Sequence, residues 1–338
     1  MRKSFWNWIL ILVSLSILVF FLVAKEGVAS MRQVFSFLQY GWLVLAVVFR
    51  VGAFCCEALS LTRIAREYSS VLSFPDAFRA VVRGIALGYV TPFGSGNFPT
   101  QVTILTRAGL RAGDASTVIM NRSVLYQFCY ATVLIIAILY QRIHNLQLTP
   151  FLWIVIYAGF FVSLGLAALF IMVMRARSVL EFLATSVIRF LGRIRLIKEP
   201  DILILHVTQE IARMSSNISL RRIGRRTLLE GYLLGIGQIV FYNLITVCVY
   251  KALGLEGSSL LTILTLQSLT SLVQAAIPSP GGMGAAEAGF IFIMTPIMGD
   301  VVVFAMLLWR LLTYYLPIFL GILSLGIVRS HEARFSVE

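Results

Sequence analysis

Five charged residues interrupt apolar stretches of this chain, where charged side chains are rare. Arg50, Arg122 and Arg310 each lie inside such a stretch. Two acidic residues, Glu57 and Glu287, lie in similar surroundings. A charged side chain at the centre of a membrane costs about 2.5–3.5 kcal/mol on insertion scales, so these residues need partners or a ligand. Because a guanidinium matches phosphate oxygens with two parallel donors, the arginines predict binding of an anionic headgroup.

A purely structural interpretation stands beside this one. Glu57 follows Arg50 by seven residues, on the same helix face and about 10 Å along it. Arg50 or Arg310 could pair with Glu57 or Glu287, and the pair would then only hold helices together. Both interpretations hold if the pair opens for a ligand.

Further polar residues extend the predicted substrate-binding set. Gln267 and Gln274 are spaced i, i+7 on one predicted helix, and Tyr314 lies one turn after Arg310. Ordinary hydrogen bonding between helices is the alternative. Arg79 and Arg83, spaced i, i+4 near a predicted membrane boundary, either recruit headgroups or anchor their helix.

The composition identifies an integral membrane protein. Of the 338 residues 59% are hydrophobic and 13% are charged, and the mean hydropathy is +0.90. Soluble domains carry about a quarter charged residues. The net charge of +13 would suggest nucleic acid in a soluble protein. In a membrane protein it reflects basic cytoplasmic loops, so we expect phospholipid partners and no nucleic acid.

Neither a metal site nor a cofactor site is predicted. The four cysteines lie in apolar runs, and their spacing fits no metal site. His144, His206 and His331 are scattered, and no nucleotide-binding or catalytic-triad motif occurs. We therefore expect no catalytic residues.

Eight apolar segments predict an all-α fold of about six transmembrane helices and two re-entrant broken hairpins. Six runs are uninterrupted, at 5–24, 39–61, 116–140, 151–174, 227–250 and 301–328. Two runs, 76–110 and 259–297, are broken by TPFGSGNFP and IPSPGGMG. The predicted break residues are Pro92, Gly94, Gly96, Asn97, Pro99, Pro278, Pro280, Gly281, Gly282 and Gly284.

Non-helical backbone at membrane depth is tolerated only where protein or a water-filled cavity covers it. Helices that restart after such breaks would direct free N–H groups and a positive dipole end at an anion. The alternative is that the breaks are structural kinks.

The distribution of basic residues predicts that both termini are cytoplasmic. The hairpin at 76–110 then enters from the cytoplasm, and the hairpin at 259–297 enters from outside. The connector at 175–226 alternates basic and apolar clusters, which predicts an amphipathic helix on the anionic inner leaflet. A solvated loop is the alternative.

An internal repeat relates the two hairpins within a single membrane domain, 1–338. Pro92 and Pro278 are 186 residues apart, and Gln101 and Glu287 share this offset, which adds Gln101 to the predicted site. The offset relates about 39–140 to about 225–328. Because the two units start on opposite sides, they are predicted to be inverted repeats, which point to a transport site near the midplane.

Three motifs, TPFGSGNFPTQ, IPSPGGMGAAEAGF and LLWRLLTYYLP, resemble the membrane-domain family of lysylphosphatidylglycerol synthase/flippase, the multiple peptide resistance factor. The resemblance implies movement of aminoacylated or other anionic-headgroup lipids between leaflets of the cell membrane, and a role in antimicrobial peptide resistance. It also implies roles for the hairpin prolines and glycines, Glu287 and Arg310. Asn97 departs from the family pattern, in which a second glycine often stands there.

In bifunctional relatives a separate soluble domain transfers lysine from tRNA. This chain ends ten residues after Val328, so we expect no such activity. The partners expected besides phospholipids are a separate soluble transferase or a second copy of the chain. Alternatives to lipid transport are intramembrane lipid modification and transport of a polyprenyl-phosphate-linked lipid or an ion-coupled solute.

Overall fold

The computed structural model describes residues 37–68, 72–91, 94–144, 149–175, 223–276 and 282–324, with a few single residues between 185 and 208. All regular structure within these ranges is helical, which confirms the all-α prediction. The predicted first helix at 5–24 lies outside the described residues, as does nearly all of the amphipathic part of the 175–226 connector.

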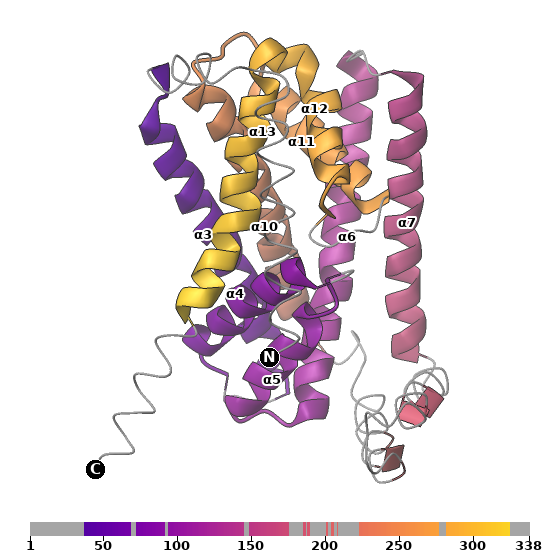
Figure 1. The fold of residues 1–338 in the computed structure, drawn as a ribbon. Helices are drawn as coiled ribbons and strands as arrows, with labels where there is room; N and C mark the ends of the chain where they lie inside the picture. The colour runs from indigo at the N-terminus through magenta and orange to yellow at the C-terminus, as the bar shows by residue number, and fades with distance from the viewer. Residues whose placement is uncertain are drawn as a thin grey trace, which may run out of the picture.

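Long helices form the frame of the bundle (Figure 1). They are α3 (Tyr40–Ala65), α6 (Ala112–His144), α7 (Pro150–Arg175), α10 (Arg225–Ala252) and α13 (Val302–Arg310). Helix α13 continues through a π-helical turn, η5 (Leu311–Tyr315), and the helical residues end at Ser324. Each of these helices coincides with a predicted apolar run.

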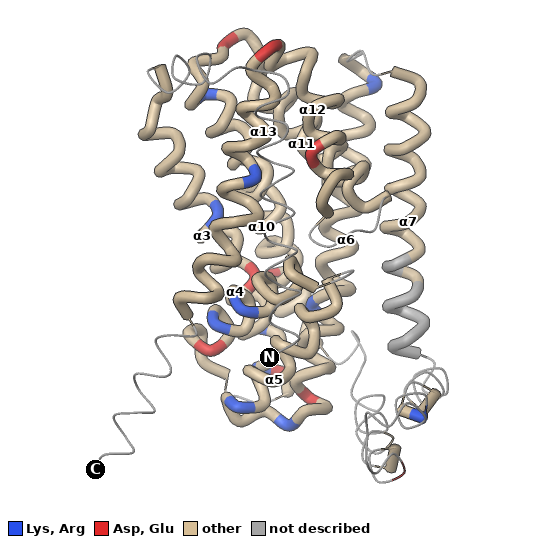
Figure 2. Tube along the Cα trace, viewed as in Figure 1, with Lys and Arg blue, Asp and Glu red and all other residues tan. Residues whose placement is uncertain are grey.

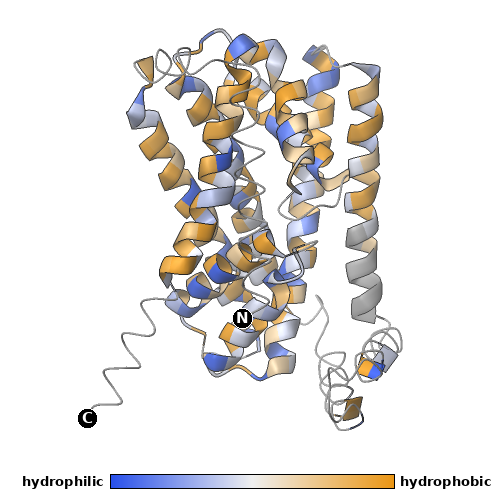
Figure 3. Cartoon of the chain, in the orientation of Figure 1, coloured by the Kyte–Doolittle hydropathy of each residue, from blue (hydrophilic) through white to orange (hydrophobic). Residues whose placement is uncertain are grey.

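Four described segments are long and apolar enough to cross a membrane: Tyr40–Ala65, Ala112–His144, Arg225–Ala252 and Ala285–Ser324. Shorter apolar segments are Pro150–Gly165 and Leu260–Ala276. Figure 3 shows hydrophobic residues along the lengths of these helices. The last long segment changes direction at Gly299, whose φ of 55° is a conformation that glycine adopts without strain.

Two short helical pairs lie at opposite ends of the bundle (Figure 1). Helices α4 (Phe74–Val90) and α5 (Asn97–Arg107) form the lower pair. Helices α11 (Leu260–Ala276) and α12 (Ala285–Met298) form the upper pair, and η4 (Gly299–Val301) joins α12 to α13.

The start of the lower pair follows from local sequence. The Ser73 hydroxyl accepts a hydrogen bond from the Asp76 amide at 3.3 Å, a proline occupies the first turn, and the Asp76 carboxylate complements the helix dipole. Both pairs bend through glycines with positive φ, namely Gly94 at 67° and Gly282 at 71°. Helices α4 and α11 therefore stop before they cross the bundle.

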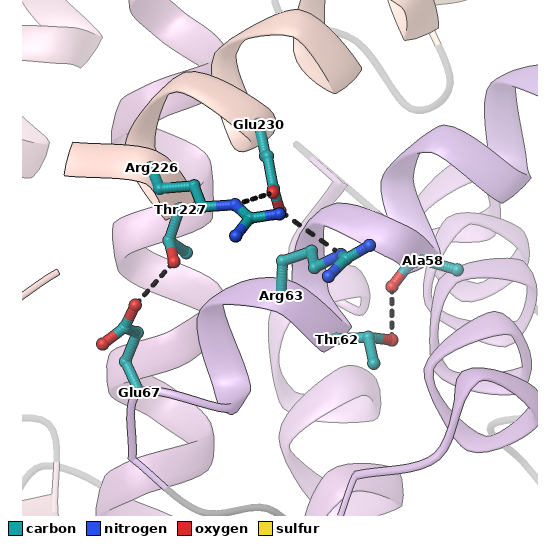
Figure 4. A network of polar contacts seen from close by, with 7 residues as sticks. All are labelled: Ala58, Thr62, Arg63, Glu67, Arg226, Thr227 and Glu230. Carbon is teal, nitrogen blue, oxygen red and sulfur yellow. Dashed lines mark hydrogen bonds and ion pairs between the residues drawn. The ribbon is translucent and has the colours of Figure 1, made fainter. Parts of the chain in front are cut away.

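Helices α3 and α10 pack against each other along their lengths, although they are far apart in the sequence. Polar contacts join the end of α3 to the start of α10 (Figure 4). Glu230 lies 3.4 Å from Arg63 and 3.0 Å from Arg226, and Thr227 donates to Glu67 at 2.6 Å. Because these groups are partly or fully exposed to solvent, each ion pair is worth only about 0–1 kcal/mol.

Close packing of α7 on α11 gives a first testable prediction. A Cβ atom added at Gly159 would overlap the carbonyl oxygen of Leu272, and backbone cannot move aside cheaply. We expect Gly159→Val to lower the free energy of unfolding by about 1–3 kcal/mol or to detach α7. Thermal unfolding in detergent measures the effect. Gly165→Val on the same helix is the control, since nothing lies within 4 Å of that position. Equal melting temperatures for the two variants would contradict the packing described.

Candidate functional site

A cavity of about 860 Å³ lies between the tips of the two helical pairs. Helices α3, α4, α6, α7, α10 and α11 contribute its walls, together with the start of α5 and Gly282. Its polar lining consists of Arg50, Glu57, Tyr89, Asn97, Arg122, Tyr126, Gln127, Tyr130, Ser163, Gln238, Tyr242, Asn243, Ser268, Ser271 and Gln274. Elements from both ends of the bundle thus converge on one polar space.

Arg50 is the least compensated charge in this cavity. The residue is 4% exposed, and its Nη2 donates to the Tyr89 hydroxyl and to the Thr313 carbonyl oxygen, each at 3.1 Å. Its guanidinium also lies 4.5 Å from the centre of the Phe54 ring and 5.4 Å from that of Tyr242. Among the described residues Arg50 forms no ion pair, and its Nε has no hydrogen-bond acceptor. A buried guanidinium in this state is preorganised for an anion.

The carbonyl group that Arg50 contacts belongs to the π-helical turn η5. Turns of this kind alter the hydrogen-bond ladder of a helix and occur frequently at functional sites. On the same turn, the Tyr314 ring stacks on Tyr89 with the ring centres 5.1 Å apart. Contacts from η5 and from the end of α4 therefore jointly fix the position of the Arg50 side chain.

A second charged group combines α3, α6 and α10. Arg122 Nη1 lies 3.1 Å from Glu57 Oε1, and Gln238 Nε2 donates to Glu57 Oε2 at 2.9 Å. Arg122 also donates to Gln238 Oε1, which closes a triangle of side chains. The side chains of Arg122 and Glu57 are 12% and 4% exposed. Glu57 thus pairs with Arg122, and not with Arg50 on its own helix.

Arg310 and Glu287 form a separate buried ion pair, with 2.8 Å between Nε and Oε1. Glu287 Oε2 also accepts from the Gly284 amide at 2.7 Å, and Arg310 Nη2 donates to the Gly282 carbonyl oxygen at 3.1 Å. Neither residue lines the cavity. The pair fixes the tip of the α11–α12 hairpin to α13.

Helices α5 and α12, which follow the breaks in the two hairpins, differ in the charge at their N-termini. Glu287 caps the first turn of α12, so a carboxylate already occupies its positive end. The first turn of α5 contains no acidic residue, and Asn97 at its start lines the cavity. The start of α5 is thus the end whose dipole remains available to an anion.

The remaining predicted binding residues lie in several places. Gln274 lines the cavity, whereas Gln267 is fully buried and accepts from Thr246 at 2.7 Å. Gln101 is buried outside the cavity lining and donates at 2.9 Å to Asn97, which lines the cavity. Two predicted residues lie at the mouth of the lower pair: Arg79 pairs with Asp76 at 3.1 Å, and Arg83 donates to Ser324 at 2.9 Å.

The break residues divide in a similar way. Gly94, Asn97 and Gly282 line the cavity. Three others, Gly96, Pro99 and Gly284, lie beside them in the described chain. Pro92, Pro278, Pro280 and Gly281 lie outside the described residues. No group of His, Cys, Asp or Glu side chains that could hold a metal ion occurs within the described ranges.

Sequence reasoning missed most of the uncharged polar lining. Tyr89, Tyr126, Tyr130 and Tyr242 contribute aromatic walls, and no spacing in the sequence distinguishes them from other tyrosines. The amides of Gln238 and Asn243 in an apolar run were a usable signal, since such residues are uncommon in membrane helices.

The sequence matches the family described as Lysylphosphatidylglycerol synthase TM region over residues 7–321, nearly the whole chain. No individual curated protein matches it. The resemblance seen in the three motifs is thereby confirmed. This family is a membrane domain connected with membrane lipids, and the chain belongs to it.

Proposed function

We propose that this protein is a flippase-like transporter that moves phospholipids with anionic or aminoacylated headgroups between the leaflets of the cell membrane. The observation that carries the proposal is Arg50, a buried guanidinium with no carboxylate among its described neighbours, at the wall of a cavity between the two hairpin tips. A lipid phosphate supplies the missing acceptor oxygens. A purely structural arginine would more often be paired, as Arg122 and Arg310 are.

The proposed mechanism depends on the two hairpins at opposite ends of the bundle. Residues 39–140 and 225–328 act as inverted repeats, each with a long helix, a hairpin and a second long helix. Hairpins at opposite ends of the bundle support this assignment (Figure 1). Small movements of one hairpin against the frame would open the cavity to one leaflet at a time. The headgroup would cross through the polar cavity while the acyl chains stay in the hydrocarbon region.

The lower end of the bundle is proposed to be cytoplasmic. Lys and Arg residues gather around α4 and α5 at this end, and fewer lie at the upper end (Figure 2). Basic residues are retained on the cytoplasmic side of membrane proteins. The terminus orientation and the cell-membrane location belong to the same proposal.

Reconstitution tests the function directly. The purified protein is placed in liposomes, and the translocation of fluorescent phosphatidylglycerol, its lysyl ester and a lipid with no ionisable headgroup is followed. We expect protein-dependent movement of at least one charged lipid, faster than that of the uncharged lipid. Equal rates in protein-containing and protein-free liposomes, with the protein shown to be folded, would overturn the proposal.

A further inference from the structure

The charges that line the cavity restrict the headgroup that it can accept. Two arginines, Arg50 and Arg122, and one carboxylate, Glu57, line it among the described residues. Because Glu57 is already paired with Arg122 at 3.1 Å, one positive charge is left over. One positive charge matches the single negative charge of a phosphodiester whose headgroup carries no ammonium group.

An ammonium group would find no unpaired carboxylate among the described lining residues, since Glu57 is paired with Arg122. The tyrosine rings that could form a cation–π cage already contact arginine side chains or other aromatic rings. Arg122 lies over the ring of Tyr126 and Arg50 over that of Tyr242, at 5.0 and 5.4 Å from the ring centres. The Tyr89 ring stacks on Tyr314, and the Tyr130 ring stacks on Tyr126. A lysyl ester adds two ammonium groups beside Arg50, where like charges repel.

A further part of the lining, called the uncharged wall below, is polar but carries no charge. It consists of Gln127, Ser163, Asn243, Ser268, Ser271 and Gln274. Along α10, Gln238 belongs to the ion-pair triangle, and Asn243 follows about 7.5 Å further, at 1.5 Å per residue. Asn243 donates to Ser268 at 2.8 Å, which connects α10 to the uncharged lining residues of α11. Amides and hydroxyls of this kind both donate to and accept from hydroxyl groups, and they supply no negative charge to balance an ammonium group.

We infer that the substrate of this site is a lipid with one phosphodiester and an uncharged, hydroxyl-bearing headgroup, in preference to an aminoacylated one. This inference rests on the proposed transport function and narrows it. The phosphate binds at Arg50, and the headgroup hydroxyls meet the uncharged wall. Phosphatidylglycerol and a polyprenyl-phosphate-linked sugar both have this chemistry.

The test compares translocation rates in proteoliposomes. The probes are phosphatidylglycerol, lysyl-phosphatidylglycerol, phosphatidylethanolamine and a polyprenyl-phosphate-linked sugar. We expect one of the two hydroxylated lipids to move at least about tenfold faster than both amine lipids, because a like charge beside Arg50 is costly. The faster of the two identifies the lipid type. If the lysyl ester moves as fast or faster, this inference is wrong while the transport proposal stands. If no lipid moves with folded protein, both fail.

An added carboxylate provides a second, independent readout. Gln127 lines the cavity and is only half-buried, so a glutamate is tolerated there. We expect Gln127→Glu to reduce or reverse the preference for the hydroxylated lipid over the lysyl ester. The matched control is Gln39→Glu, at an exposed position before α3. The same change in preference for both variants, or for neither, would contradict the assignment of the cavity.

Discussion

Replacing Arg50 by glutamine should lower the rate of lipid translocation at least about tenfold, because a charge-assisted hydrogen bond to phosphate contributes roughly 1.5–3 kcal/mol. The variant should nevertheless fold. Arg50 is buried without a carboxylate partner among the described residues, so removing its charge also removes a desolvation penalty. We therefore expect unchanged or higher thermal stability together with slower transport, a combination typical of binding sites.

Two companion variants sharpen this experiment. Arg142→Gln removes a guanidinium that is exposed and lies over Trp153 outside the cavity, and it should leave transport unchanged. Arg50→Lys keeps the charge but loses the two parallel donors, so an intermediate rate is expected. Arg50→Gln protein that melts several degrees lower and still transports at the wild-type rate would show that Arg50 is structural.

Breaking the Arg310–Glu287 pair should have the largest effect on stability. Glu287→Gln leaves the Arg310 guanidinium buried without its 2.8 Å counter-ion and weakens the cap on Gly284. Removal of one partner of a buried pair costs about 3–5 kcal/mol. We expect the melting temperature in detergent to fall sharply, and the α11–α12 hairpin to become more accessible to protease.

The double variant distinguishes pairing from a direct role in binding. In Glu287→Gln/Arg310→Met neither charge remains, so much of the lost stability should return. Transport should recover in parallel, since neither residue lines the cavity. Recovery of stability without recovery of transport would instead indicate that Arg310 or Glu287 contacts the substrate.

The sequence predicted the elements of the fold well, for a simple physical reason. A helix in a membrane needs an apolar run of suitable length, so 227–250 could be read almost directly as Arg225–Ala252. The breaks were predictable because prolines and glycines inside an apolar run have few other uses. Gly94 and Gly282 do adopt positive φ at the hairpin tips.

The partners of the buried charges could not be predicted in the same way. Glu57 and Arg50 share a helix face, but they are about 10 Å apart along it, which is too far for a direct pair. Which neighbour reaches Glu57 depends on how α6 and α10 pack against α3, and Arg122 and Gln238 reach it. The π-helical turn that presents the Thr313 carbonyl group to Arg50 also depends on tertiary packing, so no local sequence motif predicts it.

The most direct test of the central claim, that lipid headgroups cross through this cavity, is to block the cavity after reconstitution. Ser271 lies on its wall, and Ser271→Cys introduces a thiol there. A thiol-reactive compound of headgroup size should stop translocation by the variant, while the wild-type protein, with its native Cys55 and Cys56, keeps most of its rate under the same treatment. Transported lipid should also slow the labelling of Cys at position 271. Fully labelled protein that still transports lipid at its original rate would show that the headgroup takes another path.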